Sequence, residues 1–166
     1  MRLALALSLL VSTGGCSANH LTDNQMIADF EEHKVEFNAL VGYATSDCDN
    51  GVVRIDKGSV SPRIPELHRA AYEHAFTNLG ISSVKPYRNP VSGSRSISFT
   101  RTAVGIAGSG SLKEWVWASD QPKVIVKQLD APLPREGYVT KTWFNAYRHI
   151  EGNWFLHHSA DQLDTR

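Results

Sequence analysis

The sequence contains few cysteines and has no excess of charge of either sign. Only two of its 166 residues are cysteine, and 17 Lys and Arg residues balance 17 Asp and Glu residues, so the formal charge is zero with neutral histidines. Two cysteines cannot build a disulfide scaffold. A zero balance without a basic block removes the electrostatic basis of non-specific nucleic-acid binding. We therefore expect no nucleic-acid partner.

Hydrophobic runs long enough to cross a membrane are also missing from the sequence. The apolar stretch at residues 3–11 is interrupted by Ser8, whereas a spanning helix needs about 20 apolar residues. Arg2 precedes this stretch, and small residues follow it at positions 12–15. A positive start, an apolar run and small residues in this order are typical of an export signal. The alternative is a buried N-terminal helix that ends at Gly14 and Gly15.

Cys16 directly follows these two glycines. This arrangement resembles the lipobox of bacterial lipoproteins, in which a cysteine after small residues is diacylated and becomes the new N-terminus. Thr13 stands where that family favours leucine. The resemblance implies lipid attachment at Cys16 and a membrane partner, because two acyl chains anchor a protein stably. Plain secretion, with Cys16 retained or lost at another cleavage point, is the alternative.

The lipobox divides the chain into three parts. Residues 1–15 would be the signal peptide, residues 16–22 a short tether with the lipidated cysteine, and residues 23–166 one domain. An apolar content of 42% is too high for a disordered tail. Ser17 after the cysteine resembles lipoproteins that pass to the outer membrane, so we expect the domain at its periplasmic face.

Cys48 depends on the fate of Cys16. If Cys16 carries lipid, Cys48 is left alone in an oxidising compartment, where a lone thiol is usually buried or paired between chains. If lipidation does not take place, a disulfide between the two cysteines becomes feasible.

Two helices are predicted in the first half of the domain. Thr22 and Gln25 form a capping box, and the apolar spacing that follows predicts one helix from about Asp23 to Thr45. Ser61 and Pro62 begin the second helix, which Gly80 ends. Its predicted buried stripe is Ile64, Leu67, Ala71, Ala75, Phe76 and Leu79, and its solvated face is His68, Arg69, Glu73 and His74.

The remainder of the chain is predicted to form strands. Alternating or apolar segments occupy residues 52–55, 96–100, 114–118, 124–126, 138–150 and 154–158, and the last two suggest a hairpin around residues 151–153. Helices first and strands afterwards predict an α+β fold. We expect two N-terminal helices packed on one face of a mostly antiparallel sheet of four to six strands.

Several segments together resemble a group of small uncharacterised bacterial lipoproteins. They are DNGVVRID at residues 49–56, SPRIPEL at residues 61–67 and, above all, YRHIEGNW at residues 147–154. The resemblance covers most of the mature chain in order. It implies a location and a fold, and it implies no chemistry.

The C-terminal histidines are the most suggestive polar cluster. His157 and His158 precede Asp161, but neighbours in a strand point to opposite faces and cannot easily share a metal. His149 can approach either of them across the hairpin, because one residue of register decides its face. The alternatives without a function are simpler. His157 and His158 would lie at a strand end where many residue types are accepted, and His149 would be a partly buried histidine bonded to the backbone. We therefore predict no metal, no cofactor and no catalytic residue.

Two loop motifs are incomplete in this sequence, and one nucleophile motif is absent. Asp47, Asp49 and Gly51 begin like a calcium loop, but the twelfth position is Gly58 instead of glutamate. The glycine-rich segment at residues 105–110 lacks the Lys-Ser/Thr pair of a phosphate loop, and no helix signal follows it. The chain has no Gly-x-Ser-x-Gly elbow.

The four tryptophans have two interpretations. Trp115, Trp117, Trp143 and Trp154 would most simply form the core against the helices. Alternatively, they would present an aromatic surface to a partner or a glycan. Trp154 is the candidate binding residue among them.

We expect a non-catalytic, lipid-anchored envelope protein that binds an envelope protein or cell-wall material. Candidate binding residues are His149, Trp154, His157 and His158. One alternative is an immunity-type inhibitor of an envelope-targeting effector. The other is a small hydrolase or metal-dependent enzyme, which requires a deep pocket that gathers two of these histidines with a carboxylate.

Overall fold

The computed structural model describes residues 20–106, 109–130 and 143–161. In chain order, its elements are α1 (Asp23–Glu32), α2 (Lys34–Asp49), β1 (Ile55–Asp56), α3 (Glu66–Asn78), β2 (Ser83–Arg88), β3 (Arg95–Ile106), β4 (Ser109–Ala118), β5 (Trp143–Glu151) and β6 (Trp154–Asp161). The predicted signal peptide, Cys16 and the beginning of the predicted strand at residues 138–150 lie outside these ranges.

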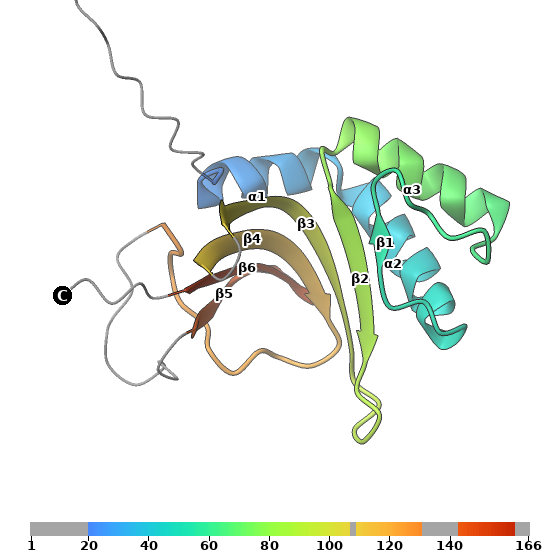
Figure 1. Cartoon of the computed structure of the whole chain (residues 1–166). Coiled ribbons are helices and arrows are strands. Elements are labelled where there is room, and N and C mark those ends of the chain that lie inside the picture. Colours follow the sequence, from blue (N-terminus) through green and yellow to red (C-terminus); the bar gives the residue numbers. More distant parts are fainter. Residues whose placement is uncertain (1–19, 107–108, 131–142, 162–166) are drawn as a thin grey trace, which may run out of the picture.

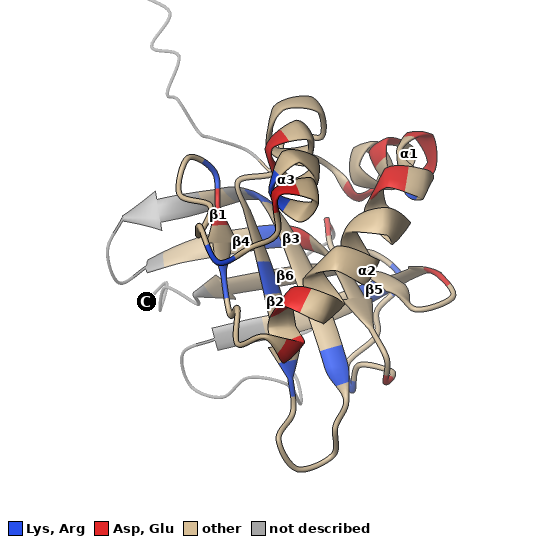
Figure 2. Ribbon diagram, turned by 90° about the vertical axis from the view of Figure 1, so that its right-hand side faces the viewer, with Lys and Arg blue, Asp and Glu red and all other residues tan. Residues whose placement is uncertain are grey.

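The six strands form one sheet in the order β1-β2-β3-β4-β6-β5, and all neighbouring strands are antiparallel. The three helices of the described ranges lie together on one side of the curved sheet (Figures 1 and 2). The α+β prediction is therefore confirmed. None of these helices is long and apolar enough to cross a membrane.

The helix predicted from Asp23 to Thr45 is in fact two helices, so the prediction of one continuous helix was wrong. Its backbone leaves the helical path at His33, with φ −111° and ψ 18°. Phe30 and Phe37 lie on either side of this break, and both rings pack against Trp154 at centroid distances of 5.0 and 5.7 Å. Phe30 and Phe37 thus contact the same core residue from two helices.

The predicted second helix begins later than its sequence signals indicate. Residues 61–64 form a turn, Pro65 is the N-cap, and α3 starts at Glu66. This start changes which side chains face the core: Tyr72 is fully buried, whereas Leu67 is 68% exposed. The predicted stripe was therefore wrong at Leu67. The prediction of a solvated face was wrong at His68, which is partly buried against Asp47.

The strand predictions at residues 52–55 and 124–126 need correction. β1 contains only Ile55 and Asp56. Residues 124–126 form no sheet strand but lie beside β5, where Val126 N donates to Tyr147 O and Tyr147 N donates to Val124 O, at 2.8 and 2.9 Å. This segment therefore covers part of the outer edge of the sheet.

The predicted C-terminal hairpin is confirmed, and its register is now defined. Gly152 and Asn153 connect β5 to β6, and Gly152 has the positive φ of +48° that such turns favour. A bulge at Ile150 shifts the pairing, so His149 lies opposite Phe155. His149 therefore shares a sheet face with His157 and not with His158.

The core lies between the helices and the sheet and contains two of the tryptophans. Trp115 and Trp154 are 0% and 4% exposed. The indole of Trp115 donates to Met26 O, and that of Trp154 donates to Asn38 Oδ1, at 2.9 and 3.1 Å. Trp154 is thus a core residue, as the simpler interpretation predicted. The side chain of Trp143 lies outside the described part of the chain.

Candidate functional site

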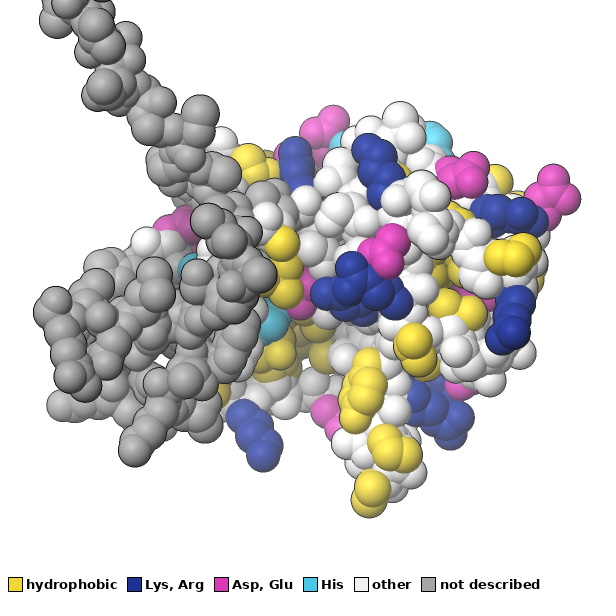
Figure 3. Space-filling model, in the orientation of Figure 1, with side chains coloured by type: hydrophobic (Ala, Val, Ile, Leu, Met, Phe, Trp, Pro, Cys, Tyr) yellow, Lys and Arg dark blue, Asp and Glu magenta, His cyan; other side chains and the backbone are white. Residues whose placement is uncertain are grey.

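The sheet face opposite the helices carries a groove. Residues on this face alternate with core residues along each strand, because successive side chains of a strand point to opposite faces. The groove has a volume of about 560 Å³, and β2, β3, β4, β5, β6 and residues 120–124 contribute to its lining. In Figure 3, hydrophobic and histidine side chains line a hollow beside the β2–β3 hairpin. We call this site the open-face groove.

A buried carboxylate and an imidazole form the polar centre of the groove. Glu114 on β4 lies opposite His157 on β6, and Glu114 Oε1 is 2.9 Å from His157 Nδ1. Thr100 on β3 donates its hydroxyl to Glu114 Oε2 at 3.0 Å. Glu114 is 4% exposed and His157 is 9% exposed. Side chains from three strands thus form one polar cluster that is almost fully shielded from solvent.

Glu114 is ionised despite its burial. Burial alone raises the pKa of a carboxyl group, but the hydrogen bonds from His157 and Thr100, together with the charges of His157 and Lys85, outweigh that effect and lower the pKa of Glu114. An ionised carboxylate only accepts hydrogen bonds. His157 Nδ1 therefore donates to Glu114, and this bond fixes the orientation of the imidazole ring.

The other side of the imidazole faces β5. His157 Nε2 lies 3.2 Å from Asn145 Oδ1, and the ring of Tyr147 stacks on the imidazole at 4.5 Å and 19°. Burial and the charge of Glu114 raise the pKa of Tyr147. Its hydroxyl therefore stays protonated and neutral across the physiological range.

A row of hydroxyl groups runs along β3 beside this cluster. Ser96, Ser98 and Thr100 alternate with the core residues Ile97 and Phe99. Within the described ranges, the hydroxyls of Ser96 and Ser98 have no hydrogen-bond partner, whereas Thr100 is bonded to Glu114. The serine side chains are short, so they leave the space that forms the groove and expose free hydroxyls to it.

The predicted histidines do not converge on one site. His157 lies in the open-face groove, but His149 lines a separate hollow of about 400 Å³ that also contains Phe155. His149 Nε2 is 3.0 Å from Gly152 O, which is the backbone interaction that the simpler interpretation predicted. Only His157 is brought beside a carboxylate in the groove.

His158 points to the opposite face of the sheet, as strand alternation predicted. Its ring lies 5.7 Å from the ring of His20, and burial lowers the pKa of both side chains. His20 in turn contacts Ser111 Oγ at 2.6 Å. His158 therefore belongs to the region where the described chain begins and not to the groove.

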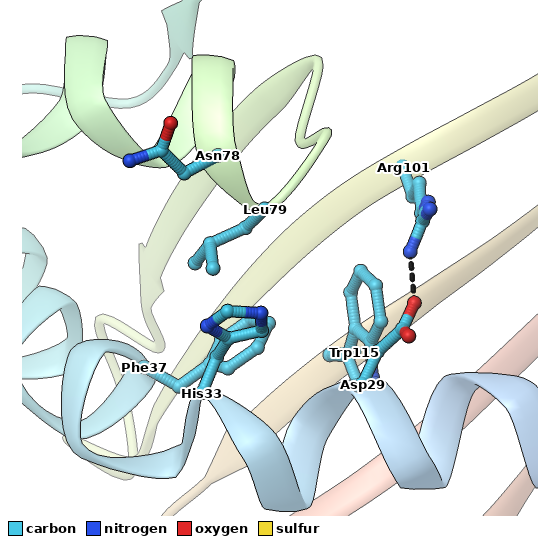
Figure 4. Close-up of a pocket in the computed structure, with 7 residues that line it drawn as sticks. All are labelled: Asp29, His33, Phe37, Asn78, Leu79, Arg101 and Trp115. Atoms are coloured by element: carbon cyan, nitrogen blue, oxygen red, sulfur yellow. Dashed lines mark hydrogen bonds and ion pairs between the residues drawn. The ribbon is translucent and has the colours of Figure 1, made fainter.

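A smaller pocket lies on the helix side (Figure 4). It has a volume of about 90 Å³, enough for a few water molecules, and Asp29, His33, Phe37, Asn78, Leu79, Arg101 and Trp115 line it. Arg101 forms an ion pair with Asp29 and lies 5.9 Å from the ring centre of Trp115. The charged groups drawn in this pocket are thus already paired with each other.

Two further predictions concern metal sites and Cys48. Among residues 20–106, 109–130 and 143–161, no group of three His, Cys, Asp or Glu side chains is placed to hold a metal ion. Cys48 is partly buried, and burial together with the charge of Asp49 raises the pKa of its thiol.

No protein family, curated protein or solved structure matches this chain.

Sequence analysis identified one of the groove residues, His157, and missed its partners. A signal for them was present, because Ser96, Ser98 and Thr100 occupy every second position of a strand. Glu114 directly precedes the apolar end of its strand, residues 115–118, and a charged residue in this position is a second signal. Only the pairing of β3, β4, β5 and β6 shows that these residues meet.

Proposed function

We propose that this protein is an exported, lipid-anchored envelope protein whose domain binds a ligand in the open-face groove without transforming it. The buried contact between Glu114 and His157 carries this proposal. Removing charged groups from water costs several kcal/mol per ion, and a pair of apolar side chains would complete this sheet face at lower cost. A polar pair retained beneath an open groove is therefore best explained by a ligand that it helps to recognise.

The sequence before the domain supports the location. Cys16 precedes His20 by four residues, which corresponds to at most about 14 Å of extended chain. A lipid on Cys16 would hold the domain close to the bilayer.

The position of the groove supports a ligand that lies away from this anchor. His20 contacts Ser111 near the beginning of β4, whereas the groove reaches Ala118 at the end of β4. Seven residues separate these ends of the strand, which is about 23 Å. The β2–β3 hairpin extends in the same direction, away from the start of α1 (Figure 1). A domain tethered through its N-terminus would present the Ala118 end of the groove on its far side, whereas Glu114 lies three residues, or about 10 Å, from Ser111 along β4.

Site-specific photocrosslinking in intact cells tests the proposal. A photoreactive amino acid at Tyr87, on the rim of the groove, is compared with one at Leu67, which is exposed on α3. We expect a defined adduct from position 87 that is missing from position 67. The side chains at the two positions are 56% and 68% exposed, so accessibility alone would label both. Equal labelling, or no adduct at position 87, would contradict the proposal.

The Glu114–His157 contact also supports a second candidate function, a small hydrolase. A carboxylate that orients Nδ1 leaves Nε2 as a general base. Within the described residues, the only hydrogen-bond partner of Nε2 is the acceptor Asn145 Oδ1. Nε2 therefore donates in this contact, and it would activate a water molecule only after giving up that proton and that bond. Recovery of the crosslinked ligand in a hydrolysed form, with the intact form accumulating in His157→Ala, would establish this function instead of simple binding.

A further inference from the structure

The charged side chains around the open-face groove are largely paired with each other. Arg95 Nη2 lies 3.0 Å from Asp49 Oδ1, and Glu114 is paired with His157. Lys85 on β2 lies opposite Ser98 on the same face, and its positive charge acts on the negative charge of Glu114. Lys123 and Asp120 remain on the exposed rim, and their charges are opposite. The groove therefore has no net excess of charge that would favour an anionic or a cationic ligand.

Apart from the charged groups on the rim and the amide nitrogen of Asn145, the free hydrogen-bonding groups of the groove are neutral hydroxyls. Ser96 and Ser98 offer one hydroxyl each, and Tyr147 adds a third; none of the three donates to another residue in the ranges that the structure describes. A hydroxyl both donates and accepts hydrogen bonds. A ligand with several uncharged donor or acceptor groups fits this row, and hydroxyl groups are one such kind.

An apolar strip lies beside the hydroxyls. Val116, Ala118 and Phe155 form a second buried cluster on this face, and Tyr147 packs against it. Tyr87 adds an aromatic ring that is 56% exposed on the rim. The ligand must therefore combine apolar faces with hydroxyl-bearing edges. Saccharide rings have this combination, with C–H groups on their faces and hydroxyls around them.

The position of the groove argues against an extended peptide. Peptides commonly add a strand to a free sheet edge, but this groove lies on the face of the sheet. Residues 124–126 already bond to β5 at one outer edge. Near the opposite edge of the sheet, β2 contains Pro86, which has no N–H to donate to an added strand.

We propose that the open-face groove binds a neutral oligosaccharide, with its hydroxyls on Ser96, Ser98 and Tyr147 and a ring face on Tyr87. This inference rests on the proposed binding function and adds the chemical class of the ligand. The volume of about 560 Å³ lies within the range of sites that hold small molecules. The groove is open at the surface, so it suits a segment of a longer chain as well as a free oligosaccharide.

The test uses the full lipoprotein in detergent micelles on an array of neutral, acidic and amino oligosaccharides, with tetrapeptides of neutral sequence beside them. We expect binding to at least one neutral oligosaccharide. Its affinity is then measured by calorimetry for Ser98→Val, which removes the hydroxyl, and Ser98→Thr, which retains one. We expect Ser98→Val to weaken binding about three- to tenfold, the equivalent of one lost hydrogen bond. Ser98→Thr should retain more of the affinity.

Tyr87→Ala should also weaken binding, whereas Leu67→Ala on α3 is the matched control that should leave it unchanged. Circular dichroism verifies that each variant is folded. Binding of no neutral oligosaccharide, or neutral binding that is unaffected by Ser98→Val and Tyr87→Ala, would overturn the inference. If tetrapeptides, acidic oligosaccharides or amino oligosaccharides bind instead and respond to these variants, the inference of a neutral oligosaccharide fails while the groove remains a binding site. If no adduct forms at position 87 in cells and no ligand binds on the array, both proposals fail.

Discussion

Lys113 Nζ lies 2.7 Å from Asp23 Oδ1, and both side chains are almost fully buried, at 3% and 2% exposure. This contact joins the first residue of α1 to the middle of the sheet. Arg148 on β5 also binds Asp23, and Leu129 N donates to it, at 3.0 and 2.7 Å. The first helix is therefore tied to β4, β5 and the chain after β4 by one buried carboxylate.

Asp23→Asn should strongly destabilise the fold. The substitution removes the negative charge, and among the described residues it leaves Lys113 with Asp130 alone as a carboxylate partner. Breaking a buried ion pair typically costs about 3–5 kcal/mol, and urea unfolding followed by circular dichroism measures this cost. The control is Lys34→Ala, because Lys34 and Glu151 form a pair that is 41% and 37% exposed. Exposed pairs contribute at most about 1 kcal/mol. Equal losses in both variants would show that burial does not determine the effect.

The free energy of unfolding should depend on Glu114 at acidic pH. Because the pKa of Glu114 is lower in the folded state than its ordinary value of 4.5, the ionised form stabilises the fold above that pH. This stabilisation is lost as the pH falls through the folded-state pKa. We expect Glu114→Gln to reduce stability by about 1–3 kcal/mol at pH 7 and to differ less from the wild type below pH 4.5.

Urea unfolding at a series of pH values between about 3.5 and 7 measures this dependence. Asp23 also has a lowered pKa, because Leu129, Lys113 and Arg148 outweigh the effect of its burial. Both proteins therefore lose stability in acid, and the quantity to follow is the difference between them. A difference that stays constant with pH would mean that the pKa of Glu114 is not lowered by folding.

Tyr72→Phe should destabilise the fold, because it removes one of the two hydrogen-bond partners of the buried Asp47 carboxylate. Tyr72 Oη donates to Asp47 Oδ2 at 2.7 Å, and His68 Nδ1 lies 2.9 Å from Oδ1. Burial raises the pKa of Tyr72, and the charge of Asp47 raises it further, so the hydroxyl remains a donor. Loss of this bond should cost about 1–3 kcal/mol in urea unfolding. Tyr43→Phe is the matched control, since that hydroxyl has no partner in the described residues, and it should be nearly neutral.

Cys16→Ser should release the protein from membranes or leave an unprocessed precursor. The reason is that the proposed anchor consists of acyl chains on this single sulfur, which add about 0.8 kcal/mol per buried methylene. Cell fractionation and intact-mass measurement detect both outcomes. Cys48→Ser changes the other cysteine and should leave the protein in the membrane with an unchanged lipid mass. A Cys16→Ser variant with wild-type fractionation and mass would disprove the anchor.

The helices show which errors sequence analysis makes in this fold. The capping box at Thr22 and Gln25 was predicted and is present, because both residues lie within one helical turn. The break at His33 has no glycine or proline to mark it. The rings on either side of it, Phe30 and Phe37, pack on Trp154, which is more than a hundred residues away in the chain. A local pattern contains no information about such a partner.

The C-terminal hairpin shows that sequence analysis has the same limit at the open-face groove. A hairpin around residues 151–153 was predicted from local residues, with a turn of two or three residues. A bulge at Ile150 sets the register and places His149 opposite Phe155. That register also places Tyr147 opposite His157. The sequence therefore identified His157 as a candidate site residue but did not show which residues surround it.

The sequence by itself determined the α+β class, the antiparallel C-terminal hairpin and the alternation that separates His157 from His158. These features depend on periodicity and on turn residues, which act over a few neighbouring positions. The tertiary structure decided that Glu114, Thr100, Tyr147 and His157 meet in one groove and that Asp23 binds Lys113 and Arg148. These contacts depend on strand order and register, which follow from the packing of distant segments against a shared core.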